Sequence, residues 1–124
     1  MGISIYYSAR RSTPLSSSEQ KAIESVDERF SVDEAILRYC ETGEGPNWES
    51  FCVYDPNDEE PDVIFAGATG LPDNSEEALW QGLQHWCSAL TEIRRALKDT
   101  EWDVAVDDHE IAWDEETEMF DPSV

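Results

Sequence analysis

The side chains in this sequence that are best able to do chemistry are carboxylates, and thirteen of them gather in two short segments. The first segment, residues 55–62, contains Asp55, Asp58, Glu59, Glu60 and Asp62. The second, residues 107–121, has no Lys or Arg and contains Asp107, Asp108, Glu110, Asp114, Glu115, Glu116, Glu118 and Asp121. Carboxylates at this density can bind a hard cation, transfer protons or attract a basic partner.

The run Asp107-Asp108-His109-Glu110 offers donors that suit a metal ion, because carboxylate oxygens bind Ca²⁺, Mg²⁺ or Mn²⁺ and an imidazole adds affinity for transition metals. Four consecutive residues in a tight turn point in different directions, so they converge on one ion only if a second segment contributes. Residues 55–62 lack the alternating ligands and the central Gly of an EF-hand loop. We therefore predict no metal site and no cofactor.

The sequence also does not indicate a nucleophile with its base. His85 and Cys87 lie two apart on a predicted helix, about 200° around its axis, so they face nearly opposite sides. There is no G-x-S-x-G elbow, and residues 67–70 are too short for a phosphate-binding loop and lack its lysine. No catalytic residue is predicted, and a small enzyme using His109 or Cys87 is a distant third interpretation.

Composition restricts the class of partner. The 124 residues include 29 Asp and Glu against 8 Lys and Arg, and the net charge of −21 is concentrated toward the C-terminal end. A nucleic acid is bound by releasing counterions to Lys and Arg, so direct binding of nucleic acid is not expected and any partner is predicted to be basic. Anionic lipid headgroups are repelled as well, and no apolar run approaches the roughly 18 residues of a membrane span.

The N-terminus and the cysteines bear on the compartment. The first residues have neither the basic region nor the apolar core of a signal peptide. Cys40, Cys52 and Cys87 form no C-x-x-C pair, which argues against a disulfide framework and against a zinc ribbon. We expect a reduced, cytoplasmic protein.

Charge alone gives no specificity, so a binding role also needs apolar anchors among the acids. Trp113, Met119 and Phe120 interrupt the second segment, and Trp113 and Phe120 are the candidate anchors. The alternative is that these side chains only cap the core, and that the acidic runs are solvated faces. The full candidate partner-binding set is Asp58, Glu59, Glu60, Asp107, Asp108, Glu110, Trp113, Asp114, Glu115, Glu116, Glu118 and Phe120.

Apolar periodicity predicts the strands that position these groups. Residues 3–9 and residues 102–107 alternate in the manner of half-buried strands. Residues 51–54 and 63–66 are β-branched and aromatic runs joined by the first acidic segment. Residues 111–113 follow a short polar turn and are expected to form a hairpin with the strand before it.

Helices are predicted by capping boxes at residues 16–19 and 31–34. The first helix is expected over residues 17–30. The second ends before Gly43, and residues 36–40 could instead form a strand.

The longest predicted helix follows caps at residues 73–75, and its basic residues near the end suit the helix dipole. It presents one apolar stripe that must pack on a flat partner, for which a sheet is the natural choice. The stripe consists of Leu79, Leu83, Trp86, Leu90, Ile93 and Leu97.

This order of elements predicts a single acidic α+β domain over residues 1–124, with a mostly antiparallel sheet and two main helices on one face. A ferredoxin-like arrangement with an added C-terminal hairpin is the first expectation. The last few residues, from Asp121, are expected to be loose.

The leading functional interpretation is a non-enzymatic acidic module that inhibits or sequesters a basic, nucleic-acid-binding protein, in the manner of a DNA mimic or a nuclease-immunity protein. Its carboxylates would stand in for phosphates. The alternative is an ordinary scaffold or housekeeping domain whose acidity is an adaptation to high salt or serves solubility.

Overall fold

The computed structural model describes residues 3–45, 47–53, 62–97, 99–106 and 109–121, and these residues form an α+β fold. The predicted fold class is confirmed. In chain order the elements are β1 (Ser4–Arg10), α1 (Ser17–Arg29), α2 (Asp33–Thr42), β2 (Val63–Gly70), α3 (Glu76–Ala96), β3 (Glu101–Val106), β4 (His109–Glu110), β5 (Ala112–Asp114) and β6 (Met119–Asp121). Within the described residues, no helix is long and apolar enough to cross a membrane.

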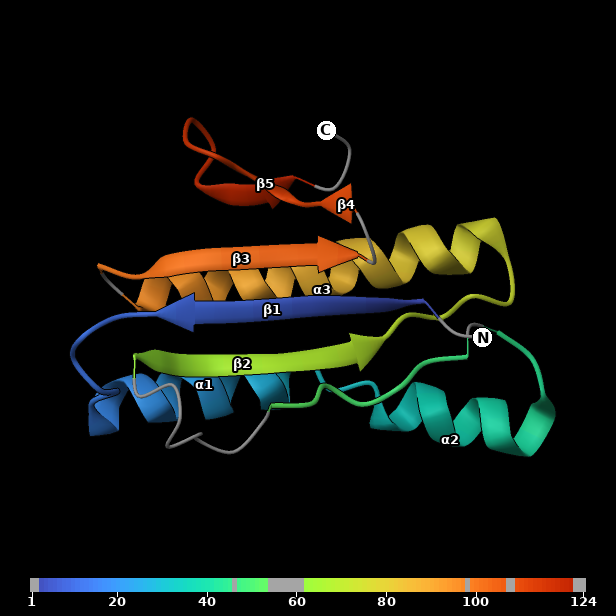
Figure 1. Ribbon diagram of the computed structural model, residues 1–124. Coiled ribbons are helices and arrows are strands. Elements are labelled where there is room, and N and C mark those ends of the chain that lie inside the picture. The colour runs from blue at the N-terminus through green and yellow to red at the C-terminus, as the bar shows by residue number, and fades with distance from the viewer. Residues whose placement is uncertain (1–2, 46, 54–61, 98, 107–108, 122–124) are drawn as a thin grey trace.

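The main sheet is antiparallel and has the strand order β2-β1-β3-β4, so β1 lies between β2 and β3 (Figure 1). Because both neighbours run against β1, they run parallel to each other, and α3 connects them. This is a split βαβ unit, which is one half of the expected ferredoxin-like arrangement.

The other half of that arrangement is incomplete. A strand is predicted over residues 51–54. Within the described residues, this segment forms one isolated β-bridge, between Val53 and Gly67. Side chains of the sheet bind this backbone instead: the Tyr7 hydroxyl donates to the Cys52 carbonyl, and the Cys52 amide donates to Thr69 Oγ1 at 3.2 Å. The segment is therefore held over the core face of the sheet and does not extend its edge as a regular strand.

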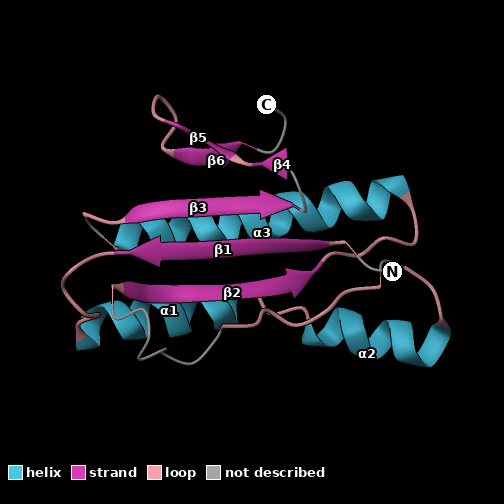
Figure 2. Ribbon diagram, in the orientation of Figure 1, coloured by secondary structure: helices cyan, strands magenta, loops and turns pink. Residues whose placement is uncertain are grey.

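The core lies between the sheet and the helices α1 and α3. Figure 2 shows the sheet in front of these two helices, with no helix between the sheet and the viewer. Alternate residues of β1 face the core, among them Ile5 and Tyr7. The predicted stripe of α3 is confirmed: Trp86, Leu90, Ile93 and Leu97 are buried, and the two leucines before them pack against the same cluster.

The helix ends confirm one of the two capping boxes. Ser16 and Glu19 cap α1 reciprocally, as predicted. The predicted box of Ser31 with Glu34 is wrong, because the N-cap of α2 is Val32, and the Ser31 hydroxyl accepts from the Asp33 amide. Residues 36–40 are helical, and α2 ends at Gly43, whose φ of +71° is the left-handed conformation that favours glycine.

The C-terminal chain forms two successive hairpins. β3 pairs with β4, and the Ile111 amide donates to the Val104 carbonyl at 2.8 Å, so the predicted hairpin forms as far as Ile111. Trp113, which was expected to continue it, instead pairs with Phe120 in the separate sheet β5–β6. The chain leaves the main sheet here because the rings of Trp113 and Phe120 pack together, with centroids 5.0 Å apart, against α3. The last residues are expected to be loose from Asp121, but Asp121 belongs to β6, and the three residues after it lie outside the described residues.

Candidate partner-binding site

The structure describes seven of the twelve predicted partner-binding residues. These are Glu110, Trp113, Asp114, Glu115, Glu116, Glu118 and Phe120. The other five, Asp58, Glu59, Glu60, Asp107 and Asp108, lie outside the described residues.

The two acidic segments adjoin opposite edges of the main sheet. Asp62, the described end of the first segment, directly precedes β2, and the second segment enters the sheet at β4. β2 and β4 are the outer strands, separated by β1 and β3, which corresponds to about 14 Å at the usual strand spacing. The described ends of the two segments therefore do not meet in one compact patch.

The second acidic segment is itself divided between two surfaces. The sheet register places Glu110 beside Ala105, and Ala105 beside Tyr6, which is 49% exposed. Tyr6 points away from the buried side of β1, so Glu110 belongs to the sheet face opposite α1 and α3. Glu115, Glu116 and Glu118 belong instead to the exposed turn between β5 and β6.

Two arginines of α3 hold this acidic turn against the body of the protein. Arg95 donates through Nε to the Glu118 carbonyl at 3.0 Å and through Nη2 to the Thr117 carbonyl at 3.2 Å. The Arg94 guanidinium lies 4.1 Å from the ring centroid of Trp113. Burial lowers the pKa of Arg94, and the charge of Glu115 acts in the opposite direction.

Neither predicted aromatic anchor is an open contact surface. Phe120 is 4% exposed and lies in the core between Trp102 and Trp113, which corrects its assignment as an anchor. Trp113 is half-buried and packs against the core, with Arg94 over its ring. This packing agrees with the alternative interpretation, in which Trp113 and Phe120 only cap the core.

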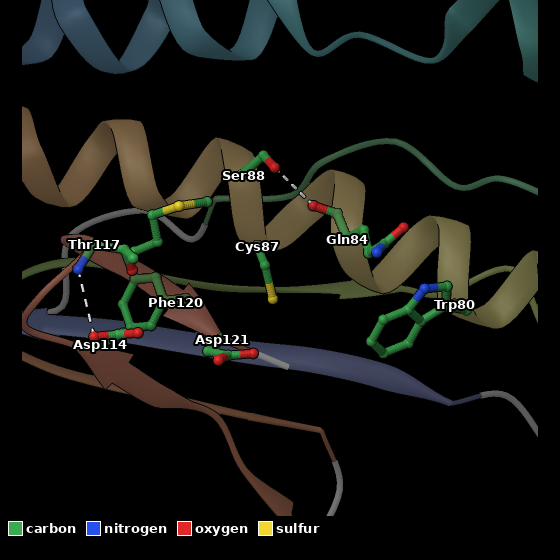
Figure 3. Close-up of a pocket in the computed structure, with 9 residues that line it drawn as sticks. Trp80, Gln84, Cys87, Ser88, Asp114, Thr117, Phe120 and Asp121 are labelled. Carbon is green, nitrogen blue, oxygen red and sulfur yellow. Dashed lines mark hydrogen bonds between the residues drawn. The ribbon is translucent and has the colours of Figure 1, made fainter. Parts of the chain in front are cut away.

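Exposed apolar side chains instead flank a groove between α3 and the β5–β6 hairpin, which we call the hairpin groove (Figure 3). Its volume is about 570 Å³. At 42% and 41% exposure, Trp80 and Met119 are among the most exposed large apolar side chains in the described residues. The groove is lined by Trp80, Gln84, Cys87, Ser88, Asp114, Thr117, Met119, Phe120 and Asp121.

The groove combines an apolar floor with carboxylates at its side. Cys87 is 2% exposed, and burial, followed by the charge of Asp121, raises the pKa of its thiol to about 12. At neutral pH this thiol is protonated and is not a nucleophile. Asp114 Oδ1 accepts from the amides of Glu116 and Thr117, at 2.9 Å and 3.4 Å, which fixes the carboxylate beside the turn.

His85, two residues before Cys87, faces a different part of the molecule. Its Nε2 lies 2.7 Å from the Phe30 carbonyl, and its ring packs edge-on against Trp48 and Trp86. This arrangement agrees with the prediction that His85 and Cys87 face opposite sides of their helix. In the described part of the chain, no three His, Cys, Asp or Glu side chains are grouped so that they could hold a metal ion.

Trp80 is the residue that sequence reasoning missed. It lies next to Leu79 but about 100° around the helix axis from it, and so outside the buried stripe. A tryptophan that lies outside the apolar stripe of an amphipathic helix is not explained by packing of that stripe on the core. Such a residue indicates a second contact surface, and this pattern could have pointed to the groove.

Most basic residues of the protein are engaged within the fold. Arg10, Arg11 and Arg29 form ion pairs with Asp62, Glu19 and Glu92, at distances of 3.3, 2.8 and 2.8 Å. Arg94 and Arg95 of α3 contact the hairpin, so internal contacts are shown for five of the seven Lys and Arg residues that the structure describes. The sequence has 29 acidic residues against 8 basic ones, so most carboxylates have no basic residue of the chain to neutralise them.

In comparisons with known proteins, no family model, no curated protein and no solved structure matches this chain.

Proposed function

We propose that this protein is an acidic protein-binding module that inhibits or sequesters a basic, nucleic-acid-binding protein, as DNA mimics and nuclease-immunity proteins do. The observation that supports the proposal is the hairpin groove, which is lined both by the exposed apolar side chains Trp80 and Met119 and by the carboxylates Asp114 and Asp121. A surface of this kind supplies both attraction for a basic protein and a shaped apolar contact.

The carboxylates act in place of phosphates. The surface of a nucleic-acid-binding protein carries Lys and Arg positioned to contact a polyanion, so it attracts any surface that presents negative charge. The net charge of −21 increases the rate of encounter with such a partner and repels free nucleic acid from the occupied site. Binding is therefore expected to compete with nucleic acid and to weaken as salt concentration rises.

The first experiment is a pull-down with the tagged protein in lysate of its source organism at about 0.1 M salt, with elution by duplex DNA. The captured protein is then purified, and its binding to a labelled duplex is measured by fluorescence anisotropy while the acidic protein is added. We expect the duplex to be released at about one acidic protein per partner. Failure of duplex DNA to displace the partner, or failure of the acidic protein to release the duplex, would contradict the proposal.

A matched pair of variants tests whether the hairpin carries the interaction. One variant neutralises the turn through Glu115→Gln, Glu116→Gln and Glu118→Gln. The control carries Glu24→Gln, Glu28→Gln and Glu34→Gln, which change the net charge equally at exposed positions of α1 and α2. We expect the turn variant to bind the partner about tenfold more weakly and the control to change affinity much less. Equal losses in both variants would show that only net charge matters.

A further inference from the structure

One side of the main sheet is not covered by any described helix. Figure 2 shows α1 and α3 behind the sheet, and Ile5, Tyr7 and Ala9 of β1 are buried against that side. The alternate residues of β1 and their register partners lie on the other side, which we call the open sheet face. It consists of Ser4, Tyr6, Ser8 and Arg10 of β1, Ala66, Ala68 and Gly70 of β2, Glu101, Asp103 and Ala105 of β3, and Glu110 of β4.

Tyr6 projects from the middle of this face and is 49% exposed. Ala68 and Ala105 lie directly beside it on the two neighbouring strands, and Ser4 and Ser8 come before and after it on β1. An aromatic residue on a sheet gains stability chiefly from a large side chain on the neighbouring strand, and Tyr6 has only small ones beside it. Packing within the fold therefore does not explain this ring, which is available to a ligand.

Carboxylates lie on the β3 and β4 side of Tyr6. Asp103 lies opposite Ser8 and so is diagonal to Tyr6, while Glu110 follows Ala105 in the same row as Tyr6. Asp103 and Glu110 are exposed, and neither forms a hydrogen bond or ion pair with another described residue. The face is therefore complementary to a cation that also offers a surface for the ring.

The spacing of Tyr6 and Asp103 suits one guanidinium. Diagonal residues on neighbouring antiparallel strands are about 7–8 Å apart, and their side chains stand roughly parallel. Elsewhere in this protein, the Arg94 guanidinium lies 4.1 Å from the centroid of the Trp113 ring. With a charge-assisted hydrogen bond of about 2.8 Å on its other side, a guanidinium in such a position spans about 7 Å.

We propose that the open sheet face binds an arginine side chain of the basic partner, with the guanidinium between the Tyr6 ring and the Asp103 carboxylate. A planar guanidinium stacks on a ring and donates to a carboxylate in the same pose, whereas an ammonium group is a compact and strongly hydrated charge. This inference rests on the proposed function, because it names the surface and the side chain by which such a partner is recognised.

The experiment is a titration of the complete protein with the peptide acetyl-Arg-Gly-Arg-amide at about 0.02 M salt, where charge pairs are weakly screened. The two arginines of an extended peptide lie about 7 Å apart on one side, so the second one reaches Glu110, which is diagonal to Asp103. Backbone amide resonances report the site. We expect saturable shifts that are largest on the open sheet face, with a Kd on the order of 1 mM. The peptide acetyl-Lys-Gly-Lys-amide should bind at least about threefold more weakly.

Variants separate the ring from the charge. Tyr6→Thr keeps a residue that favours strands and removes the ring, so it should weaken the arginine peptide about fivefold, whereas Tyr6→Phe should bind it within about twofold of the wild type. Asp103→Asn should also weaken it about fivefold. Glu24→Gln, an equal charge change at an exposed position of α1, is the control and should have little effect. The same spectra report whether each variant is folded.

Three outcomes would overturn the inference: equal binding of the lysine peptide, unchanged binding by Tyr6→Thr, or shifts that are largest away from the open sheet face. These outcomes leave the proposed function standing if duplex DNA still displaces a captured partner. Conversely, arginine binding between Tyr6 and Asp103 without any nucleic-acid-binding partner would support the surface and contradict the proposed function.

Discussion

A single carboxylate, Glu19, joins the chain after β1 to the start of α1. Its two oxygens accept from Arg11 Nη1 and Nη2, each at 2.8 Å, and Oε1 also accepts from the Ser16 amide at 2.9 Å. These bonds hold the pKa of Glu19 at about 2, with the bond to Arg11 as the largest cause. Glu19 therefore links the charge state of one residue to the stability of the fold.

We predict that Glu19→Gln lowers the melting temperature at pH 7 and flattens its dependence on acid. A lowered pKa stabilises the fold above the ordinary carboxyl value of about 4.5, and this stabilisation is lost as the pH falls toward about 2. The difference in melting temperature between the wild type and Glu19→Gln should therefore shrink between pH 4.5 and pH 2. Thermal unfolding at pH 7, 4 and 2.5 measures it. The control is Glu24→Gln on the exposed side of α1, and a constant difference across this range would refute the assignment.

Residues whose role is local could be predicted from the sequence, and residues whose role depends on distant contacts could not. The capping box of Ser16 with Glu19 involves only neighbours in the chain, and it forms as predicted. The exposure of Trp80 and the burial of Phe120 depend on where the hairpin lies against α3. Nothing in the spacing of these aromatic residues indicated that contact.

Among the elements, α3 both covers the sheet and holds the C-terminal hairpin. The Thr91 hydroxyl, which is buried, donates to the Cys87 carbonyl at 2.7 Å and accepts from the Phe120 amide at 3.1 Å. Together with Arg95 it fixes β6 and the turn to one side of the helix. The shape of the hairpin groove therefore depends on this docking.

We predict that Thr91→Val destabilises the protein by about 1–3 kcal/mol, because it removes the acceptor and leaves the buried Phe120 amide without its partner. Urea unfolding followed by circular dichroism measures the loss. Amide exchange should accelerate more at Phe120 than at Val104, which lies in the main sheet. Ser88→Ala is the control, since this hydroxyl donates only to the Gln84 carbonyl of the same helix, and a change within about 0.5 kcal/mol is expected. Equal effects of the two variants would contradict the role of Thr91.

The long elements were predictable and the short ones were not. α3 has a six-residue stripe and caps at its start, so the pattern alone places it. β5 and β6 have three residues each, and alternation over three residues does not specify a partner strand. Their pairing follows from the packing of Trp113 and Phe120, which is a tertiary contact.

For the whole molecule, charge is abundant but not as dense as on a nucleic acid. The accessible surface of 7960 Å² shared by 29 acidic residues gives about 270 Å² each. Duplex DNA, at one charge per about 1.7 Å of axis, presents roughly 110 Å² per charge. Average charge density therefore does not reproduce that of DNA, and the proposed function requires a surface where the carboxylates are locally denser.

The net charge of −21 also determines how the fold responds to salt. Repulsion among the carboxylates acts over about 30 Å at 0.01 M salt and about 10 Å at 0.1 M, so added salt should raise the melting temperature. A module that captures a partner by charge has to be folded in dilute salt, where charge interactions are weakly screened. The buried core, which includes Ile5 and Phe120, and the internal ion pairs favour folding under these conditions. We predict that the protein is folded at 25 °C in about 0.01 M salt, as measured by tryptophan fluorescence and circular dichroism.

The variant with Glu24→Gln, Glu28→Gln and Glu34→Gln separates repulsion from binding of specific ions. If repulsion is the cause, this variant melts several degrees higher than the wild type in dilute buffer, and the two proteins converge at about 2 M salt, where the screening length is only a few ångströms. Loss of the native fluorescence below about 0.5 M salt would contradict the prediction and favour a domain adapted to a high-salt environment. In that case the carboxylates would be an adaptation to high salt, and a binding role for the hairpin groove would have to be argued from its shape alone.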